Sequence, residues 1–179
     1  MPTDIVLLPL KQFDLAKERL RRAGTVDATA IARALATAVI TACRPRRIVI
    51  VGENVQLERF AAEHGVEYFE SAALELNGAV HNAYRRIASS GSRIFVVHGD
   101  LREPAGLGTF EPEDGVTVVT DHHGSGTPVL VLPGGMDFHF HYGPDSALLH
   151  RLEAQRLGVN VHVIGDSVWS RDVDEVNDL

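Results

Sequence analysis

The chain has little of what marks secreted, membrane-spanning or nucleic-acid-binding proteins. Its single cysteine, Cys43, excludes an intrachain disulfide and agrees with a reducing cytoplasm. No apolar run approaches the roughly 18 residues that a membrane-spanning helix needs. The net charge is -7 and long Lys/Arg runs are absent, so no broad contact with nucleic acid is expected. Residues 1–10 contain Asp4 and Pro9 in place of the basic start and apolar stretch of a signal peptide. These absences predict a cytoplasmic protein that binds neither membranes nor nucleic acids.

The composition and the order of apolar segments predict one α/β domain spanning residues 1–179. Hydrophobic residues make up 45% of the 179 residues and charged residues 23%, which is typical of a soluble globular protein. Short apolar runs typical of buried strands occur at residues 5–9, 48–51, 66–69, 94–97, 116–120, 129–132 and 159–164. Helical spacing or helix boundary signals occur at residues 28–43, with Asp27 as N-cap, and at 55–64, 77–88 and 144–157. Strands that alternate with helices imply a three-layer, mostly parallel sheet.

Acidic residues are the first candidates for chemistry. Asp100 directly follows the expected strand at 94–97, and ligands of open α/β sheets bind beyond the carboxyl ends of the strands. Asp172 and Asp174 alternate near the end of the chain, so in an extended segment they share a side and could hold a cation with a distant carboxylate. Taken alone, the Asp-x-Asp pattern is better explained by a solvated tail.

Two Gly-containing turns could bind an anion. The turn Gly124-Ser125-Gly126-Thr127 could surround a phosphate with N–H and hydroxyl groups, although a plain hairpin turn explains it better when it is considered alone. The segment Gly143-Pro144-Asp145-Ser146 stands at an expected helix start, where free N–H groups attract anions. Without a second phosphate ligand nearby, ordinary helix capping is the preferred interpretation there.

Basic and histidine residues could likewise bind a ligand or simply lie on the solvated surface. Lys11, Lys17 and Arg19 follow the first expected strand and could contact a triphosphate or form a solvated face. His139 and His141 would share one face of an extended segment, but without a matching Cys/His partner we do not expect a metal site there.

These segments together resemble one family, over nearly the whole chain. The segments are Leu8-Pro9-Leu10-Lys11 with Ala16-Lys17-Glu18-Arg19-Leu20, Leu76-Asn77-Gly78-Ala79, His98-Gly99-Asp100-Leu101, Asp121-His122-His123-Gly124-Ser125-Gly126-Thr127, Tyr142-Gly143-Pro144-Asp145-Ser146 and Asp172-Val173-Asp174. Their order is similar to that in the 2-phospho-L-lactate or phosphoenolpyruvate guanylyltransferases of coenzyme F-420 biosynthesis. The D-x-H-G-S-G-T and aromatic-G-P-x-S strings are the most specific parts.

The resemblance implies a nucleotide-diphospho-sugar-transferase-like (Rossmann-like) fold and an enzyme that transfers GMP from GTP to a small phospho-acid. It implies Mg²⁺ on Asp100, Asp172 and Asp174, and catalytic roles for Asp100, Lys11 and Lys17. It also implies nucleotide contacts from Lys11, Lys17, Arg19 and Asn77, and acceptor contacts from Gly126, Thr127, Gly143 and Ser146.

The chain departs from the family at four positions. The family usually has Pro where Arg102 stands, Arg where His122 stands, and Gly where Glu75 and Asp145 stand. Two alternatives stay open: a molybdopterin or sugar-phosphate nucleotidyltransferase of the same fold, and a weakly active relative that binds nucleotide or a partner protein. The second is favoured if Glu75 and Asp145 weaken substrate binding. The choice of acceptor acid, of GTP or ATP, and of monomer or homodimer also stays open.

Overall fold

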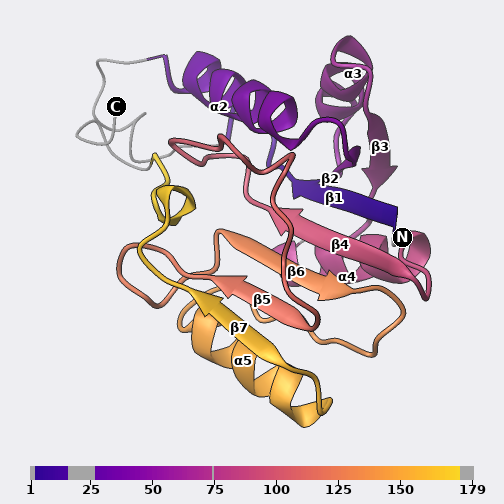
Figure 1. The fold of residues 1–179 in the computed structure, drawn as a ribbon. Helices are drawn as coiled ribbons and strands as arrows, with labels where there is room; N and C mark the ends of the chain where they lie inside the picture. Colours follow the sequence, from indigo (N-terminus) through magenta and orange to yellow (C-terminus); the bar gives the residue numbers. More distant parts are fainter. Residues whose placement is uncertain (1–2, 16–26, 74, 174–179) are drawn as a thin grey trace.

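A central seven-stranded sheet organises the computed structural model, which describes residues 3–15, 27–73 and 75–173 (Figure 1). The strands are β1 (Thr3–Pro9), β2 (Arg47–Gly52), β3 (Glu67–Glu70), β4 (Ser92–Val97), β5 (Val116–Val119), β6 (Val129–Pro133) and β7 (Val161–Ile164). Their order is β3-β2-β1-β4-β6-β5-β7, and every neighbouring pair is parallel except the two that involve β6. The expected mostly parallel sheet is confirmed.

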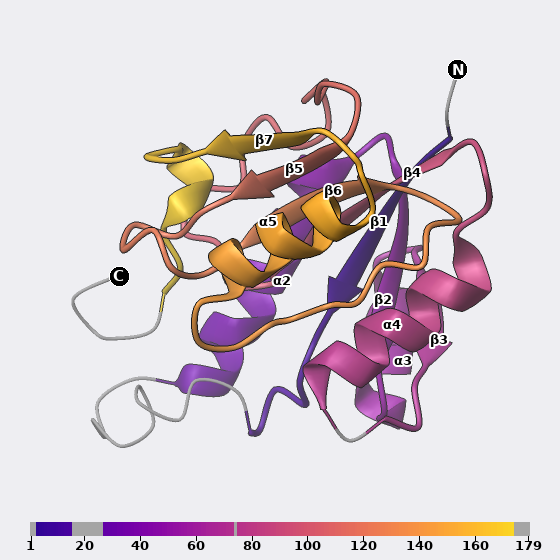
Figure 2. The same cartoon turned by 90° about the horizontal axis from the view of Figure 1, so that it is seen from below.

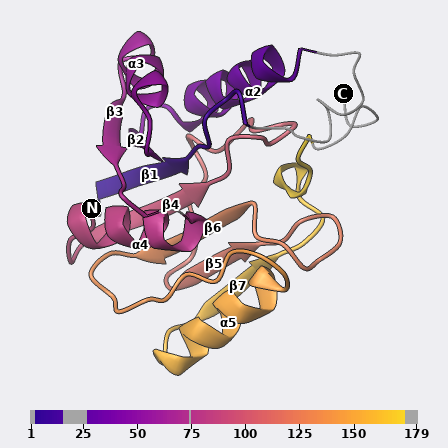
Figure 3. The same cartoon turned by 180° about the vertical axis from the view of Figure 1, so that it is seen from behind.

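Helices cover both faces of this sheet, which gives three layers (Figure 2). The two helices α2 (Ala28–Cys43) and α3 (Val55–Glu63) pack on one face. The opposite face carries α4 (Leu76–Ile87) and α5 (Ser146–Arg156), which lie in front of the sheet in Figure 3. Among the described residues, no helix combines the length and apolarity needed to cross a membrane.

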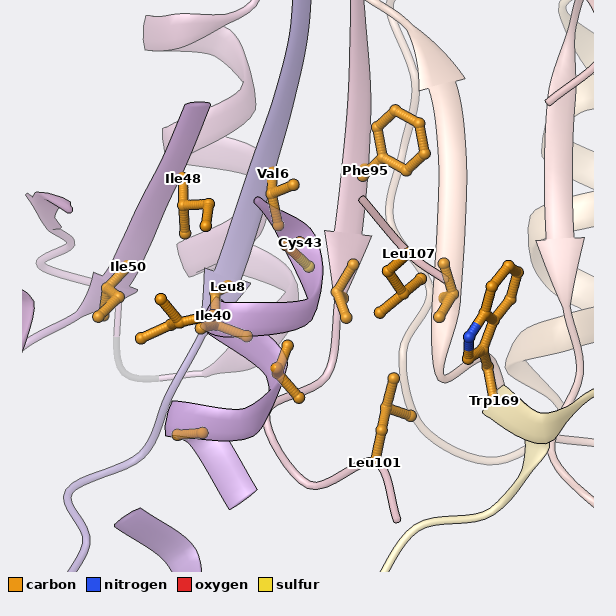
Figure 4. Packing of buried hydrophobic residues seen from close by; sticks show 14 of the residues in the cluster. Val6, Leu8, Ile40, Cys43, Ile48, Ile50, Phe95, Leu101, Leu107 and Trp169 are labelled. Carbon is orange, nitrogen blue, oxygen red and sulfur yellow. The ribbon is translucent and has the colours of Figure 1, made fainter. Parts of the chain in front are cut away.

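Strand alternation divides the core into two halves. Val6, Leu8 and Ile50 point toward α2 and α3, where Ile40 packs on them (Figure 4). Their chain neighbours in the strands point to the opposite half, which α4 and α5 cover. Continuous apolar runs therefore mark strands that are buried on both faces.

The start of α5 differs from its prediction. We expected the helix to begin near Pro144, but it begins at Ser146, after Gly143 and Asp145, which have positive φ angles of 127° and 57°. Such angles interrupt a right-handed helix, so Pro144 lies in a turn rather than in the first helical turn.

Sheet topology fixes where polar loops gather. The arrowheads of β1, β4, β5 and β7 point to the same side in Figure 1, and β6 runs the other way. The carboxyl ends of the parallel strands and the start of β6 therefore share one edge. Most candidate site residues that the structure describes lie in loops at this edge, and Asn77 is in the first turn of α4, which follows the carboxyl end of β3. Gly143 and Ser146 follow β6 instead, and the start of α5 reaches this edge through a main-chain hydrogen bond from Ala147 to Ser125.

Candidate functional site

Main-chain hydrogen bonds join four loops at the carboxyl edge. The N–H of His98, just after β4, donates to Pro128 O at 3.0 Å, beside the start of β6. The N–H of His122 donates to Ser170 O at 2.8 Å, and that of Ala147 donates to Ser125 O at 2.9 Å. Segments far apart in sequence thus form one surface.

The predicted acidic site begins with two neighbouring segments. Leu101 and Asp172 form an isolated antiparallel bridge, and the N–H of Val173 donates to Asp100 O at 3.0 Å. Asp100 and Asp172, both partly exposed, therefore lie on adjacent stretches of main chain. Asp174 lies outside the described residues, and within them no group of three or more His, Cys, Asp or Glu side chains is arranged to hold a metal. Shared metal binding by the three carboxylates stays a prediction.

The end of β1 approaches the end of β4 through Leu10. Its N–H donates to Val51 O at 3.0 Å, and a Cβ on Gly99 would come within 2.3 Å of the Leu10 side chain. Gly99 thus admits Leu10 next to the Asp100 segment, which places the exposed Lys11 at the same edge. Lys17 and Arg19 lie outside the described residues, so their expected nucleotide contacts stay predictions.

Two of the predicted acceptor-binding residues meet directly. Thr127 Oγ1 and Ser146 Oγ are 3.0 Å apart, and both side chains are buried. His150 Nδ1 lies 3.1 Å from Thr127 Oγ1, and the N–H of His141 donates to His150 Nε2 at 2.9 Å. The result is a chain of hydrogen bonds from the main chain through a fully buried imidazole to two hydroxyl groups.

Asp121 organises the Gly-containing turn. Its carboxylate accepts from the N–H of Ser125 at 2.9 Å, its carbonyl accepts from Gly124, and its N–H donates to Gly126 O. A Cβ on Gly126 would lie 2.5 Å from Asp121 Oδ2, so a larger residue there would displace the Asp121 carboxylate from this position. Because β5 and β6 pair in antiparallel register, the hairpin interpretation of this segment is confirmed, and contact with an acceptor stays a prediction.

Asn77 holds the segment before Gly143. Its Nδ2 donates to Tyr142 O at 2.9 Å, and its Oδ1 accepts from the N–H of Tyr142 at 2.6 Å. Both ends of the amide therefore serve the main chain of the loop, which is a positioning role that the sequence did not indicate. The predicted contact between Asn77 and a nucleotide is untested.

Side chains from α5 support the same extended segment. Glu153 accepts from the N–H of His139 at 2.8 Å, two residues before the bond from His141 to His150. Phe138, Phe140 and Tyr142 are buried, whereas His139 is exposed and His141 is partly so, which confirms the expected alternation. Sequence reasoning missed His150 and Glu153, although His150 stands four residues after Ser146, a spacing that places two side chains on one face of a helix.

Protein groups occupy part of the candidate anion site at the start of α5. The N–H of Ser146 donates to Gly143 O at 3.3 Å, and that of Ala147 donates to Ser125 O. These bonds satisfy two of the amide groups that a helix start otherwise presents. Hydroxyl groups rather than helix amides are thus the more promising donors here.

The four departures from the family pattern are all at exposed positions. Asp145 adopts φ 57°, where glycine costs least and Asp is among the more tolerant residues, so its backbone accommodates the change. Glu75 caps α4 without a side-chain hydrogen bond. The His122 ring contacts the His123 ring at a tilt of 42° and a centroid distance of 3.7 Å, and Arg102 donates its N–H to Arg171 O.

Comparison with known proteins gives this site a family context. The family model described as "Guanylyl transferase CofC like" matches residues 4–179. A phosphoenolpyruvate guanylyltransferase of Chloroflexus aurantiacus is 31% identical over 185 residues, covering 95% of this chain and 89% of the relative. One of Roseiflexus castenholzii is 28% identical, with coverage of 97% and 84%.

Solved structures agree on the fold. A putative nucleotide-diphospho-sugar transferase from Desulfovibrio desulfuricans has a TM-score of 0.73 at 15% identity and covers 99% of this chain and 85% of its own. An inositol-1-phosphate CTP transferase from T. maritima has a TM-score of 0.60 at 18% identity, with coverage of 99% and 91%. The fold is therefore that of the nucleotide-diphospho-sugar transferases, and the chain belongs to the CofC-like guanylyl transferase family.

Proposed function

We propose that this chain transfers GMP from GTP to the phosphate of a small phospho-acid and releases pyrophosphate, as a step of coenzyme F-420 biosynthesis. The observation that carries the proposal is the family match over residues 4–179. The names of the relatives favour phosphoenolpyruvate as acceptor, and 2-phospho-L-lactate is the alternative of similar chemistry. The single cysteine supports a cytoplasmic location. A homodimer stays a prediction.

The reaction brings two anions together, so the site has to neutralise charge. Carboxylate oxygens are the ligands that Mg²⁺ prefers, and Asp100 and Asp172 lie on adjacent main-chain segments, so their donor chemistry fits this ion. We assign these two residues, with Asp174, to hold it. Bound Mg²⁺ would supply positive charge beside the triphosphate. Lys11 at the same edge, together with Lys17 and Arg19, would add cationic groups for the triphosphate and the departing pyrophosphate.

No protein nucleophile is required. An ionised oxygen of the acceptor phosphate attacks the α-phosphorus of GTP, a new P–O bond forms, and the bond to the β-phosphate oxygen breaks. The electron pair of that bond leaves with pyrophosphate. We therefore expect direct in-line transfer, and isolation of a covalently nucleotidylated protein during turnover would contradict it.

The acceptor would lie against the second half of the site. Thr127 and Ser146 offer hydroxyl donors, and Gly126 and Gly143 shape the two loops that carry them. Asn77 holds the second of these loops in place. This arrangement separates a region that binds the nucleotide and metal from one that binds the acid.

Pyrophosphate release tests the proposal. GTP and ATP are each combined with phosphoenolpyruvate, 2-phospho-L-lactate or 3-phosphoglycerate in the presence of Mg²⁺. We expect release with GTP and one of the first two acids, and a kcat lowered about 100-fold or more by Asp100→Asn. Asp114→Asn, which removes an equal charge from an exposed loop before β5, should leave the rate unchanged.

Two outcomes of the same assay would contradict the proposal. Undiminished release by Asp100→Asn would remove this residue from the catalytic site. An absence of release with every pair, combined with GTP binding in isothermal titration calorimetry, would support a non-catalytic relative instead.

A further inference from the structure

His150 has a fixed tautomer in this structure. Its Nε2 accepts the N–H of His141 at 2.9 Å, so this nitrogen carries no hydrogen. A neutral imidazole then carries its hydrogen on Nδ1, which lies 3.1 Å from Thr127 Oγ1. His150 therefore donates to Thr127. Burial is the main cause of the lowering of the His150 pKa to about 3, which keeps the ring neutral at ordinary pH.

The direction of the hydrogen bond between His150 and Thr127 decides how many hydroxyl hydrogens of Thr127 and Ser146 stay available to a ligand. Thr127 and Ser146 bring two hydroxyl hydrogens, and the contact between them, at 3.0 Å, uses one. With His150 as donor, the second hydrogen stays available to another acceptor. With the opposite tautomer, Thr127 would donate to His150 and Ser146 to Thr127, and both hydrogens would be used.

The remaining hydrogen has no acceptor within the described protein. No further hydrogen-bond partner of either hydroxyl occurs among residues 3–15, 27–73 and 75–173. The pair lies beside the Asp100 segment, because the N–H of His98 donates to Pro128 O immediately after Thr127. A donor without a protein acceptor at this place matches an anionic oxygen of a ligand.

We propose that His150 is a positioning residue for the phospho-acid: it holds the Thr127 and Ser146 hydroxyls so that one hydrogen is left to donate to an anionic oxygen of the acceptor. The inference rests on the proposed function for the identity of the ligand. The inference adds His150 to the residues of the acceptor site, although His150 does not itself contact the substrate. It also explains why a buried imidazole is hydrogen-bonded to one of two paired hydroxyl groups.

Two variants separate the functions of the two ring nitrogens of His150. In His150→Asn the side-chain amide can reach the place of Nδ1 and keep a donor to Thr127. In His150→Gln the amide oxygen can reach the place of Nε2 and keep the acceptor for His141, but the donor to Thr127 is lost. His162→Gln, on the edge strand β7, is the control for replacing a histidine elsewhere.

Steady-state kinetics with both substrates supply the first test. We expect His150→Gln to raise the KM for the phospho-acid about 10-fold, because the Thr127 hydroxyl is no longer held by a donor and its hydrogen bond to the charged acid weakens, while the KM for GTP changes little. His150→Asn should recover most of this loss. Equal effects of the two variants on the acid, or parallel rises in both KM values, would overturn the proposal.

Two readouts do not depend on turnover. Nitrogen-15 NMR of the wild-type chain should show His150 protonated at Nδ1 and not at Nε2, and the opposite tautomer would overturn the inference even if the enzyme is active. Calorimetric binding of pyruvate and of inorganic phosphate then identifies the anionic group, since His150→Gln should weaken one of them, and no change in either would also overturn it. If the tautomer is as stated but pyrophosphate is never released, the proposed function fails instead.

Discussion

The side-chain amide of Asn77 binds the main chain of Tyr142 at two points, 65 residues further along the chain, with contacts of 2.9 and 2.6 Å. This pair joins α4 to the loop that leads to Gly143 and Ser146. The extended segment around Tyr142 belongs to none of the strands, so its polar groups depend on side chains for hydrogen bonds. Asn77 thereby links the stability of the protein to the shape of the loop that carries the proposed acceptor contacts.

Replacing Asn77 should therefore affect both properties. Asn77→Ala leaves the N–H and the carbonyl of Tyr142 without their partners, which should lower the free energy of unfolding by about 2 kcal/mol and raise the KM for the phospho-acid. Asn82→Ala, an exposed position on the same helix, is the matched control and should change neither. Urea unfolding and steady-state kinetics measure the two effects. Equal stability of the two variants would show that the Asn77 amide is not needed to hold the loop.

A buried cation stabilises the edge of the sheet where the parallel strands begin, opposite the candidate site. The Arg46 side chain is 4% exposed, and its Nε lies 3.0 Å from Asp4 Oδ2. The guanidinium also donates to the carbonyls of Leu107 and Phe110, and its Cζ lies 4.3 Å from the centroid of the Phe95 ring. We expect Arg46→Met to lower the free energy of unfolding by about 3 kcal/mol, because Asp4 and two carbonyls lose a shared donor.

The exposed ion pair of the neighbouring residue, Arg47, provides a comparison with the buried Arg46. Arg47 forms an ion pair with Glu67 at 2.7 Å, but their side chains are 44% and 54% exposed. Arg47→Met should therefore change the unfolding free energy by less than about 1 kcal/mol. Chemical denaturation of both variants gives the difference, and similar losses would indicate that burial does not decide the strength of these pairs.

Much of the fold followed from local patterns. The strands are continuous apolar runs because helices cover both faces of the sheet, and the Asp27 side chain caps α2 by accepting the N–H of Ala30 at 3.0 Å, as expected. The start of α5 was misplaced because Pro144 suits a turn as well as a first helical turn, and the backbone at Asp145 decides between them.

The candidate site was predictable only in part. Position after a strand correctly placed Asp100 at the carboxyl edge, and the bridge between Leu101 and Asp172 confirms that the two acidic segments are neighbours. The roles of Asn77 and His150 depend on contacts with main-chain groups of Tyr142 and His141, which no residue type specifies. Such contacts arise from the tertiary fold and leave little trace in one sequence.

Glu153 makes the stability of the protein sensitive to acid. Hydrogen bonds from Arg156 lower the pKa of Glu153 from 4.5 to about 2, and the N–H of His139 adds to this effect. Because the folded-state pKa lies below the unfolded value, the carboxylate stabilises the protein above about pH 4.5, and this contribution disappears as the pH falls toward 2.

Glu153→Gln should therefore be less stable than the wild type by about 1 to 2 kcal/mol near neutral pH, a range that allows for solvent around the half-exposed Arg156. The difference should shrink as the pH falls from about 4.5 to about 2. Glu67→Gln is the control, since the pKa of Glu67 is also lowered, first by its hydrogen bond with Arg47, but this pair is exposed and should contribute less. Urea unfolding across this pH range measures each contribution. A Glu153→Gln deficit that persists undiminished at the acid end would mean that the amide disturbs packing, and that the charge of Glu153 is not what stabilises the segment around His139.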